Sequence, residues 1–172
     1  MYIFIFWAFY LITANRSFQI LSMEIIAFED QYEADFRRLN LEWLYAYQLA
    51  EDHDLEILAN PRAVIIEPGG CIFLAMDNTA VAGTAALIRV SEAVYELAKM
   101  TVAKDYRGRG VSKLLMDSCL QAARQNGAKK ILLFSNHQLQ AALHLYRQYG
   151  FADVPVADSP FVTADVKMEL VL

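Results

Sequence analysis

The order of helical and strand patterns along the chain predicts a single α/β domain, with a mixed, mostly antiparallel sheet flanked by helices. Three observations lead to this fold class. The 172 residues are enough for one domain with a substantial core and few for two. Two apolar runs flank an Asp-Asn turn, which is typical of an antiparallel hairpin. Strand and helix patterns then alternate in the C-terminal half, so the element order as a whole is mixed.

The N-terminal part of this domain is expected to hold one strand and two helices. The alternating segment 23–28, MEIIAF, is bounded by Glu-Asp-Gln and predicts a first strand. Apolar residues recur at helical spacing over residues 32–49, which predicts an amphipathic helix. Residues 51–61 predict a short second helix that Pro61 stops.

The remaining elements follow from apolar runs and their turn residues. Residues 71–90 predict two strands of a hairpin that turns at Asp77-Asn78, and residues 94–103 predict a further strand beside them. Residues 129–136 predict a strand that is buried on both faces. Residues 138–151 predict a helix and residues 167–172 a terminal strand.

A helix is also expected over residues 111–125, where Asn126-Gly127 ends it. Its core-facing stripe is expected to consist of Val111, Leu114, Leu115, Cys119, Ala122 and Ala123. The segment YRGRGVSKLL, residues 106–115, spans the start of this helix and carries the strongest functional signal of the chain.

Composition narrows the classes of function. The formal net charge of −5 and a pI near 5.2 argue against a broad nucleic-acid-binding surface, which would need a cationic face. Cys71 and Cys119 lie far apart and form no metal-like pair, so we expect reduced core thiols in a cytoplasmic protein. His53, His137 and His144 show no metal spacing, and no metal is expected.

Residues 1–22 begin with an unbroken apolar run, MYIFIFWAFYLI. This run is too short for a spanning helix, which needs about 20 apolar residues. A signal peptide would carry cations before the run, yet the first cation is Arg16. We therefore expect residues 1–22 to be an extension outside a functional domain of residues 23–172. A membrane-surface anchor is the alternative, although the usual charge pattern is missing.

The segment 106–115 places two arginines and two glycines at the start of a helix. Unpaired N–H groups and the positive end of the helix dipole favour an anion there, and glycine allows close approach. The spacing excludes a nucleotide-hydrolase phosphate loop, and Lys113 stands where a dinucleotide fingerprint needs its third glycine. An Arg-x-x-Gly-x-small pattern remains, formed by Arg107, Gly110 and Ser112.

This pattern resembles the acetyl-CoA motif Gln/Arg-x-x-Gly-x-Gly/Ala of the GNAT (Gcn5-related) N-acetyltransferases, with Ser112 as a departure at the last position. YELAKMTVAKDYRGRG resembles the family's fourth strand and its pyrophosphate loop. ILLFSN followed by AALHLYRQYGF resembles the fifth strand and the fourth helix. The resemblance covers roughly residues 80–152, and residues 23–79 fit the variable N-terminal half.

The resemblance implies that acetyl-CoA is the co-substrate and that its pyrophosphate lies against the loop. Gly108 belongs to that loop, and Arg107 and Lys113 would place positive charge nearby. The N–H groups that would converge on the pyrophosphate are those of Arg109, Gly110, Val111, Ser112 and Lys113.

The resemblance also implies a bulge in the preceding strand, which would admit the pantetheine arm. There the N–H groups of Met100, Thr101 and Val102 would polarise the thioester carbonyl and stabilise the oxyanion. Tyr146 matches a tyrosine that would protonate the departing thiolate, and a buried tyrosine bonded to a carbonyl is the alternative. Asn136 would hydrogen bond the pantetheine arm or a water, or else cap the following helix.

The acceptor side is less sharply defined. Glu96, on the fourth strand, is the candidate general base acting through a water, because the resemblance implies a carboxylate there; a cross-strand surface charge is the alternative. Glu42 and Trp43, together with Tyr45 and the loop 159–165, SPFVTAD, would wall the acceptor pocket, and Asp165 would add negative charge that suits a cationic amine.

The expected function is direct transfer of an acetyl group from acetyl-CoA to a primary amine of a small molecule or peptide, without a covalent enzyme intermediate. Three alternatives stay open: a CoA-binding sensor or scaffold without catalysis, a different acyl donor, and a peripheral membrane protein that uses residues 1–22. The family often dimerises, so a homodimer is considered as well.

Overall fold

The computed structural model describes residues 23–157 and 159–172. The expectation about residues 1–22 therefore lies outside the described part of the chain. A seven-stranded sheet has the order β1-β2-β3-β4-β5-β7-β6. Its strands are β1 (Met23–Ala27), β2 (Cys71–Asp77), β3 (Ala80–Arg89), β4 (Val94–Val102), β5 (Lys130–Ser135), β6 (Ala152–Val154) and β7 (Val166–Val171). Its helices are α2 (Glu33–Ala46), α3 (Asp52–Ala59), α4 (Val111–Gln125) and α5 (Gln140–Gln148).

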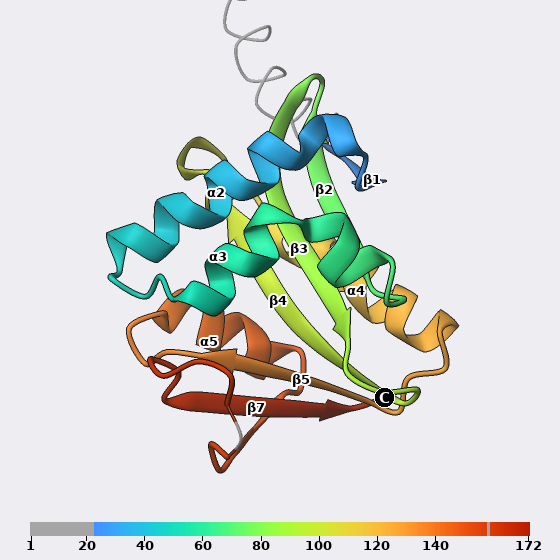
Figure 1. The fold of residues 1–172 in the computed structure, drawn as a ribbon, viewed down its shortest axis with the longest axis vertical. Helices are drawn as coiled ribbons and strands as arrows, with labels where there is room; N and C mark the ends of the chain where they lie inside the picture. The colour runs from blue at the N-terminus through green and yellow to red at the C-terminus, as the bar shows by residue number, and fades with distance from the viewer. Residues whose placement is uncertain (1–22, 158) are drawn as a thin grey trace, which may run out of the picture.

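Helices cover both faces of the sheet, with α2 and α3 on one face and α4 and α5 on the other (Figure 1). Each face has its own hydrophobic cluster. Phe36 and Leu44 of α2 pack in one cluster with Leu58 of α3, while Leu115 of α4 and Leu143 of α5 pack in the other. Within the described residues every helix is too short or too polar to span a bilayer.

The fold class is confirmed. Every strand pair is antiparallel except the parallel pair of β4 and β5, so the sheet is mixed and mostly antiparallel. The predicted hairpin, the long helices and the terminal strand are all present. Sequence patterns did not reveal β6 or the short helical turns η1 (Asp30–Tyr32), η2 (Arg62–Ile66) and η3 (Lys104–Tyr106), because segments this short show no periodicity.

Two details of burial differ from the expectation. The buried stripe of α4 includes Met116 and Leu120, whereas Leu114 is 40% exposed, so the helix is rotated from the expected orientation. β5 is buried on one face only. Its other face, which carries Leu132 and Phe134, is half-buried because the neighbouring strand β4 turns away from it.

The divergence of β4 and β5 is the feature that positions the site. The two strands pair only from Val94 to Glu96 on β4, and the rest of β4 has no partner on that side. Opposite β3, the register shifts so that β4 carries one extra residue, and Lys99 adopts a left-handed φ of 53° there. The structure thus contains the bulge and the opening that the resemblance implied.

Candidate active site

Residues 106–113, which lead from the connection after β4 into the first turn of α4, are called the donor loop here. Gly108 and Gly110 have φ values of 74° and 82°, and Gly110 is the N-cap of α4. A Cβ atom at either glycine would meet no atom within 4 Å. The loop therefore requires glycine at these positions for the backbone conformation and not for space.

The side chains of the donor loop surround the start of α4 with positive charge. Arg107 Nε donates a hydrogen bond of 3.2 Å to the carbonyl of Val102, which ties the loop to the end of β4. The Arg109 guanidinium lies 5.2 Å from the centre of the Tyr106 ring. Lys113 is exposed in the first turn of the helix. Three cations thus stand beside the positive end of the helix dipole.

The backbone of the donor loop fits a phosphate ligand. Among the described residues, no backbone carbonyl accepts a hydrogen bond from the N–H groups of Gly108, Arg109 or Gly110. The first N–H groups of a helix also lack partners within the helix, but the N–H of Lys113 already donates to the Gly110 carbonyl at 3.0 Å and is not among the free donors. The loop therefore presents several free donors and no carboxylate of its own, a chemistry that suits the pyrophosphate of CoA.

Tyr146 lies on the face of α5 that packs into the core, 5.9 Å from Phe151 between ring centres. Burial, followed by the nearby Cys119, raises the pKa of its hydroxyl to about 12. Among the described residues, no group forms a hydrogen bond with this hydroxyl. Every fully buried side-chain oxygen or nitrogen in these residues has a hydrogen-bond partner. Within these residues the Tyr146 hydroxyl thus has no hydrogen-bond partner, and it is therefore not fully buried.

A cavity of about 80 Å³ lies on the sheet face covered by α2 and α3, and its walls include the diverging parts of β4 and β5. We call it the acceptor cavity. It brings together Trp43, Glu96 and Asn136, three of the residues that the sequence indicated. The complete lining is Trp43, Leu44, Leu49, Asp54, Glu96, Ala98, Lys99, Phe134, Ser135, Asn136, Leu139, Phe161, Thr163 and Ala164.

Glu96 is the last residue of β4 that pairs with β5, where it lies opposite Leu132. Burial raises the pKa of its carboxyl group to about 7; Lys99 opposes this rise and Asp54 adds to it. At neutral pH this side chain is therefore divided between its acid and its carboxylate form, which is the condition for efficient proton exchange.

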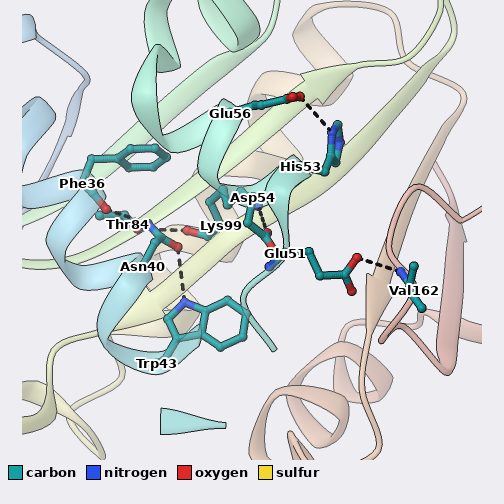
Figure 2. Close-up of polar contacts among 10 residues, drawn as sticks. All are labelled: Phe36, Asn40, Trp43, Glu51, His53, Asp54, Glu56, Thr84, Lys99 and Val162. Atoms are coloured by element: carbon teal, nitrogen blue, oxygen red, sulfur yellow. Dashed lines mark hydrogen bonds and ion pairs between the residues drawn. The ribbon is translucent and has the colours of Figure 1, made fainter. Parts of the chain in front are cut away.

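Sequence analysis missed the buried ion pair in the cavity. Lys99 Nζ donates to Asp54 of α3, and their side chains are only 3% and 5% exposed (Figure 2). Trp43 Nε1 donates to Asn40, which in turn donates to Thr84 and fixes this side of the cavity. Lys99 and Asp54 are 45 residues apart, so no local pattern could have joined them.

The segment 159–165 closes one side of the cavity. Glu51, the N-cap of α3, accepts hydrogen bonds from the N–H groups of Val162 and Thr163 at 2.8 and 2.7 Å (Figure 2 draws the first). Burial raises the pKa of Glu51, but hydrogen bonds from Thr163, its side chain included, and from Val162 outweigh it and leave the pKa below its ordinary value. The Phe161 ring, which this segment carries, lies against Phe134.

Asn136 also holds this segment. Its Nδ2 donates to the Thr163 carbonyl at 2.7 Å, and its Oδ1 accepts from Gln138 N–H at 3.0 Å. It does not cap α5, whose N-cap is Leu139. A contact with a pantetheine arm stays a prediction.

Two further predicted residues lie outside the cavity. Glu42 is exposed on α2, and Asp165 is exposed and paired with His137. The hydrogen bond from His137 holds the pKa of Asp165 below its ordinary value. Their roles in acceptor binding stay predictions. In the described residues, no group of three or more His, Cys, Asp or Glu side chains could hold a metal ion.

Comparison with known proteins decides the family. A sequence model of the acetyltransferase (GNAT) family matches residues 27–151, well over half of the chain. The chain belongs to the GNAT family. The match runs from the last residue of β1 through the donor loop to just beyond α5, so it includes both the donor loop and most of the acceptor cavity.

Relatives of this GNAT protein agree with that assignment. It is 27% identical over 95 residues to human N-acetyltransferase 8B, a match of 52% of this chain and 42% of the relative. It is 34% identical over 97 residues to N-acetylaspartate synthetase of Xenopus tropicalis, covering 56% of this chain and 36% of the relative. The matches thus span less than half of either relative.

The fold of the GNAT protein is also found in solved structures. An acetyltransferase of the GNAT family from Staphylococcus aureus superposes with a TM-score of 0.78 at 22% sequence identity. The superposition covers 86% of this chain and 97% of the other. At this level of identity the likeness shows the fold, a mixed seven-stranded sheet flanked by helices.

Proposed function

We propose that this GNAT protein transfers an acetyl group from acetyl-CoA to a primary amine of a small molecule or peptide. The observation that carries the proposal is the divergence of β4 and β5. The donor loop follows the end of β4, while Glu96 marks the point where the strands part and lines the acceptor cavity. A donor and an acceptor can therefore meet in one opening.

The residues divide the chemistry as follows. The donor loop binds the pyrophosphate through its free N–H groups and cations, and the bound co-substrate supplies the activated acetyl group. Glu96 takes a proton from the acceptor ammonium, through a water, because only the neutral amine has a free electron pair. The N–H groups of Met100, Thr101 and Val102 stabilise negative charge on the acetyl oxygen. Tyr146 donates its proton to the departing thiolate.

The charge of the cavity supports an amine acceptor. Its ionisable lining residues are Asp54, Glu96 and Lys99, and Lys99 is already paired with Asp54. The unpaired carboxyl group of Glu96 is thus left to meet a cation. Trp43, Phe134 and Phe161 supply apolar walls that would pack against the carbon skeleton of the acceptor.

The test is a calorimetric titration of the full chain with acetyl-CoA, followed by thiol release with a polyamine, an amino acid and a short peptide. We expect micromolar binding and turnover with at least one amine. Absence of binding by the folded chain would overturn the proposal. Binding without turnover on any amine would instead favour the sensor or scaffold alternative.

A further inference from the structure

Lys99 and Asp54 form an ion pair almost wholly out of water, in the same cavity as Glu96. Lys99 comes from the bulge of β4 and Asp54 from the first turn of α3 (Figure 2). Such a pair gives up the hydration of two charges. Replacing a buried ion pair by apolar residues of similar size often leaves a protein equally stable or more stable. The need for a core therefore does not account for it.

The contacts around Lys99 hold its charge in one place. Its backbone is in the left-handed region, and its carbonyl accepts a hydrogen bond of 2.9 Å from Thr84 Oγ1. Its ammonium lies 5.3 Å from the centre of the Phe161 ring. Asp54 is fixed in turn, because its second carboxylate oxygen accepts from Glu51 N–H at 3.2 Å. Strained backbone of this kind persists where surrounding contacts enforce it, and it is often found at functional sites.

Glu96 has few other charges near it. Its partners across the sheet are Ile88 on β3 and Leu132 on β5, both apolar. Among the residues that line the cavity, only Lys99 and Asp54 are ionisable besides Glu96 itself. Lys99 lowers the pKa of Glu96 and is the stronger of the two influences, while Asp54 raises it.

We propose that Lys99 and Asp54 are positioning residues for acetyl transfer. As a fixed pair of opposite charges beside Glu96, they set the pH range in which Glu96 can take a proton from the acceptor amine. The inference rests on the proposed role of Glu96 as the base. It concerns two residues that do not touch the acceptor nitrogen and act through their field alone.

The test is a titration of the Glu96 carboxyl carbon by NMR in the full chain, with its signal assigned by its loss in Glu96→Gln. Three variants are compared with the wild type: Asp54→Asn, Lys99→Met and the double variant. Asp54→Asn removes a negative charge and lowers the midpoint, whereas Lys99→Met raises it, each by about one pH unit. The double variant lies between wild type and Lys99→Met, because Lys99 has the larger influence.

The matched control is Lys130→Met, which breaks the half-buried pair of Lys130 and Glu169, 3.0 Å apart, between β5 and β7. It is expected to leave the midpoint in place. A purely structural pair would give the same midpoint in all folded variants, and that result overturns the inference. If one single variant does not fold, the other decides, because a midpoint equal to wild type after the loss of only one of the two charges has the same meaning.

Turnover separates this inference from the proposed function. The acidic limb of the kcat/KM profile is expected to move with the NMR midpoint in each variant. An NMR midpoint that shifts in a chain that acetylates no amine would contradict the proposed function and leave the electrostatic coupling standing. Turnover with unshifted midpoints would support the proposed function and contradict the electrostatic coupling.

Discussion

The donor loop and the acceptor cavity are built in opposite ways. The donor loop is one continuous segment, and its main requirement is a backbone with two left-handed glycines at the start of a helix. The acceptor cavity draws on α2, α3, β4, β5 and the segment 159–165, and it depends on side chains that meet only in the folded chain. Changes in the first region should therefore alter donor affinity, and changes in the second should alter proton transfer and acceptor use.

The largest effect is expected for Glu96→Gln, which keeps the shape of the side chain and removes the base. We expect kcat to fall by about 10²–10⁴-fold, as is usual when a general base is lost. The affinity for acetyl-CoA, measured by calorimetry, should stay unchanged. Glu92→Gln, an exposed position just before β4, is the matched control and should keep full activity. Equal losses of turnover and donor affinity would contradict the separation of the two regions.

Tyr146→Phe tests the donor side of the chemistry without touching the loop. The loss of one proton donor should lower kcat by about a hundredfold while acetyl-CoA still binds. Tyr149→Phe is the control, because that tyrosine lies on the same helix end and its hydroxyl donates to Asp117 at 2.8 Å instead. Full turnover of Tyr146→Phe would leave Tyr146 a core residue.

Gly110→Val should weaken acetyl-CoA binding by well over tenfold. Valine is strained at a φ of 82°, so the loop must shift and its N–H groups lose their common direction. Gly127→Val is the matched control, since Gly127 has a φ of 73° beyond the other end of α4 and equally open surroundings. Both variants should lose stability in thermal unfolding, but only the first should lose calorimetric affinity.

The last prediction concerns stability and not turnover or donor affinity. The pKa of Glu96 is about 7 in the folded chain, whereas the ordinary value, taken for the unfolded chain, is 4.5. The folded state therefore binds the proton more tightly than the unfolded state. This contribution to the free energy of unfolding is present below pH 4.5 and is lost as the pH rises to about 7. Urea unfolding across that range should show wild type losing stability relative to Glu96→Gln. A constant difference would mean that Glu96 titrates normally.

These contrasts also explain which features the sequence could predict. The donor loop and α4 were predictable because their signals are local: glycines before the helix, an apolar stripe within it and Asn126-Gly127 after it. β6 pairs with β7 over three residues only, too few to show an alternating pattern. Fold and family thus follow from short-range patterns.

The acceptor cavity was predictable only in part. Glu96 came from a family resemblance, and Trp43 and the loop that carries Phe161 were expected as walls of an acceptor pocket, whereas Asp54 reaches the cavity through tertiary packing alone. One local signal existed, because Glu51 and Asp54 form a capping box at the start of α3. That signal predicts a helix start, but not that Asp54 would also meet a lysine from the sheet or that Glu51 would hold Val162.

The bulge at Lys99 also shifts the phase of β4. Before it, Tyr95 and Leu97 point to the α4 side of the sheet; after it, Met100 and Val102 pack on that side. A strand with regular alternation would place these two pairs on opposite faces. Deletion of Lys99 would remove the bulge and restore regular alternation, with Met100 and Val102 still on the α4 side. A regular strand one residue shorter would thus pack the same side chains on each face, so the extra residue matters for the opening beside β5 and not for the core.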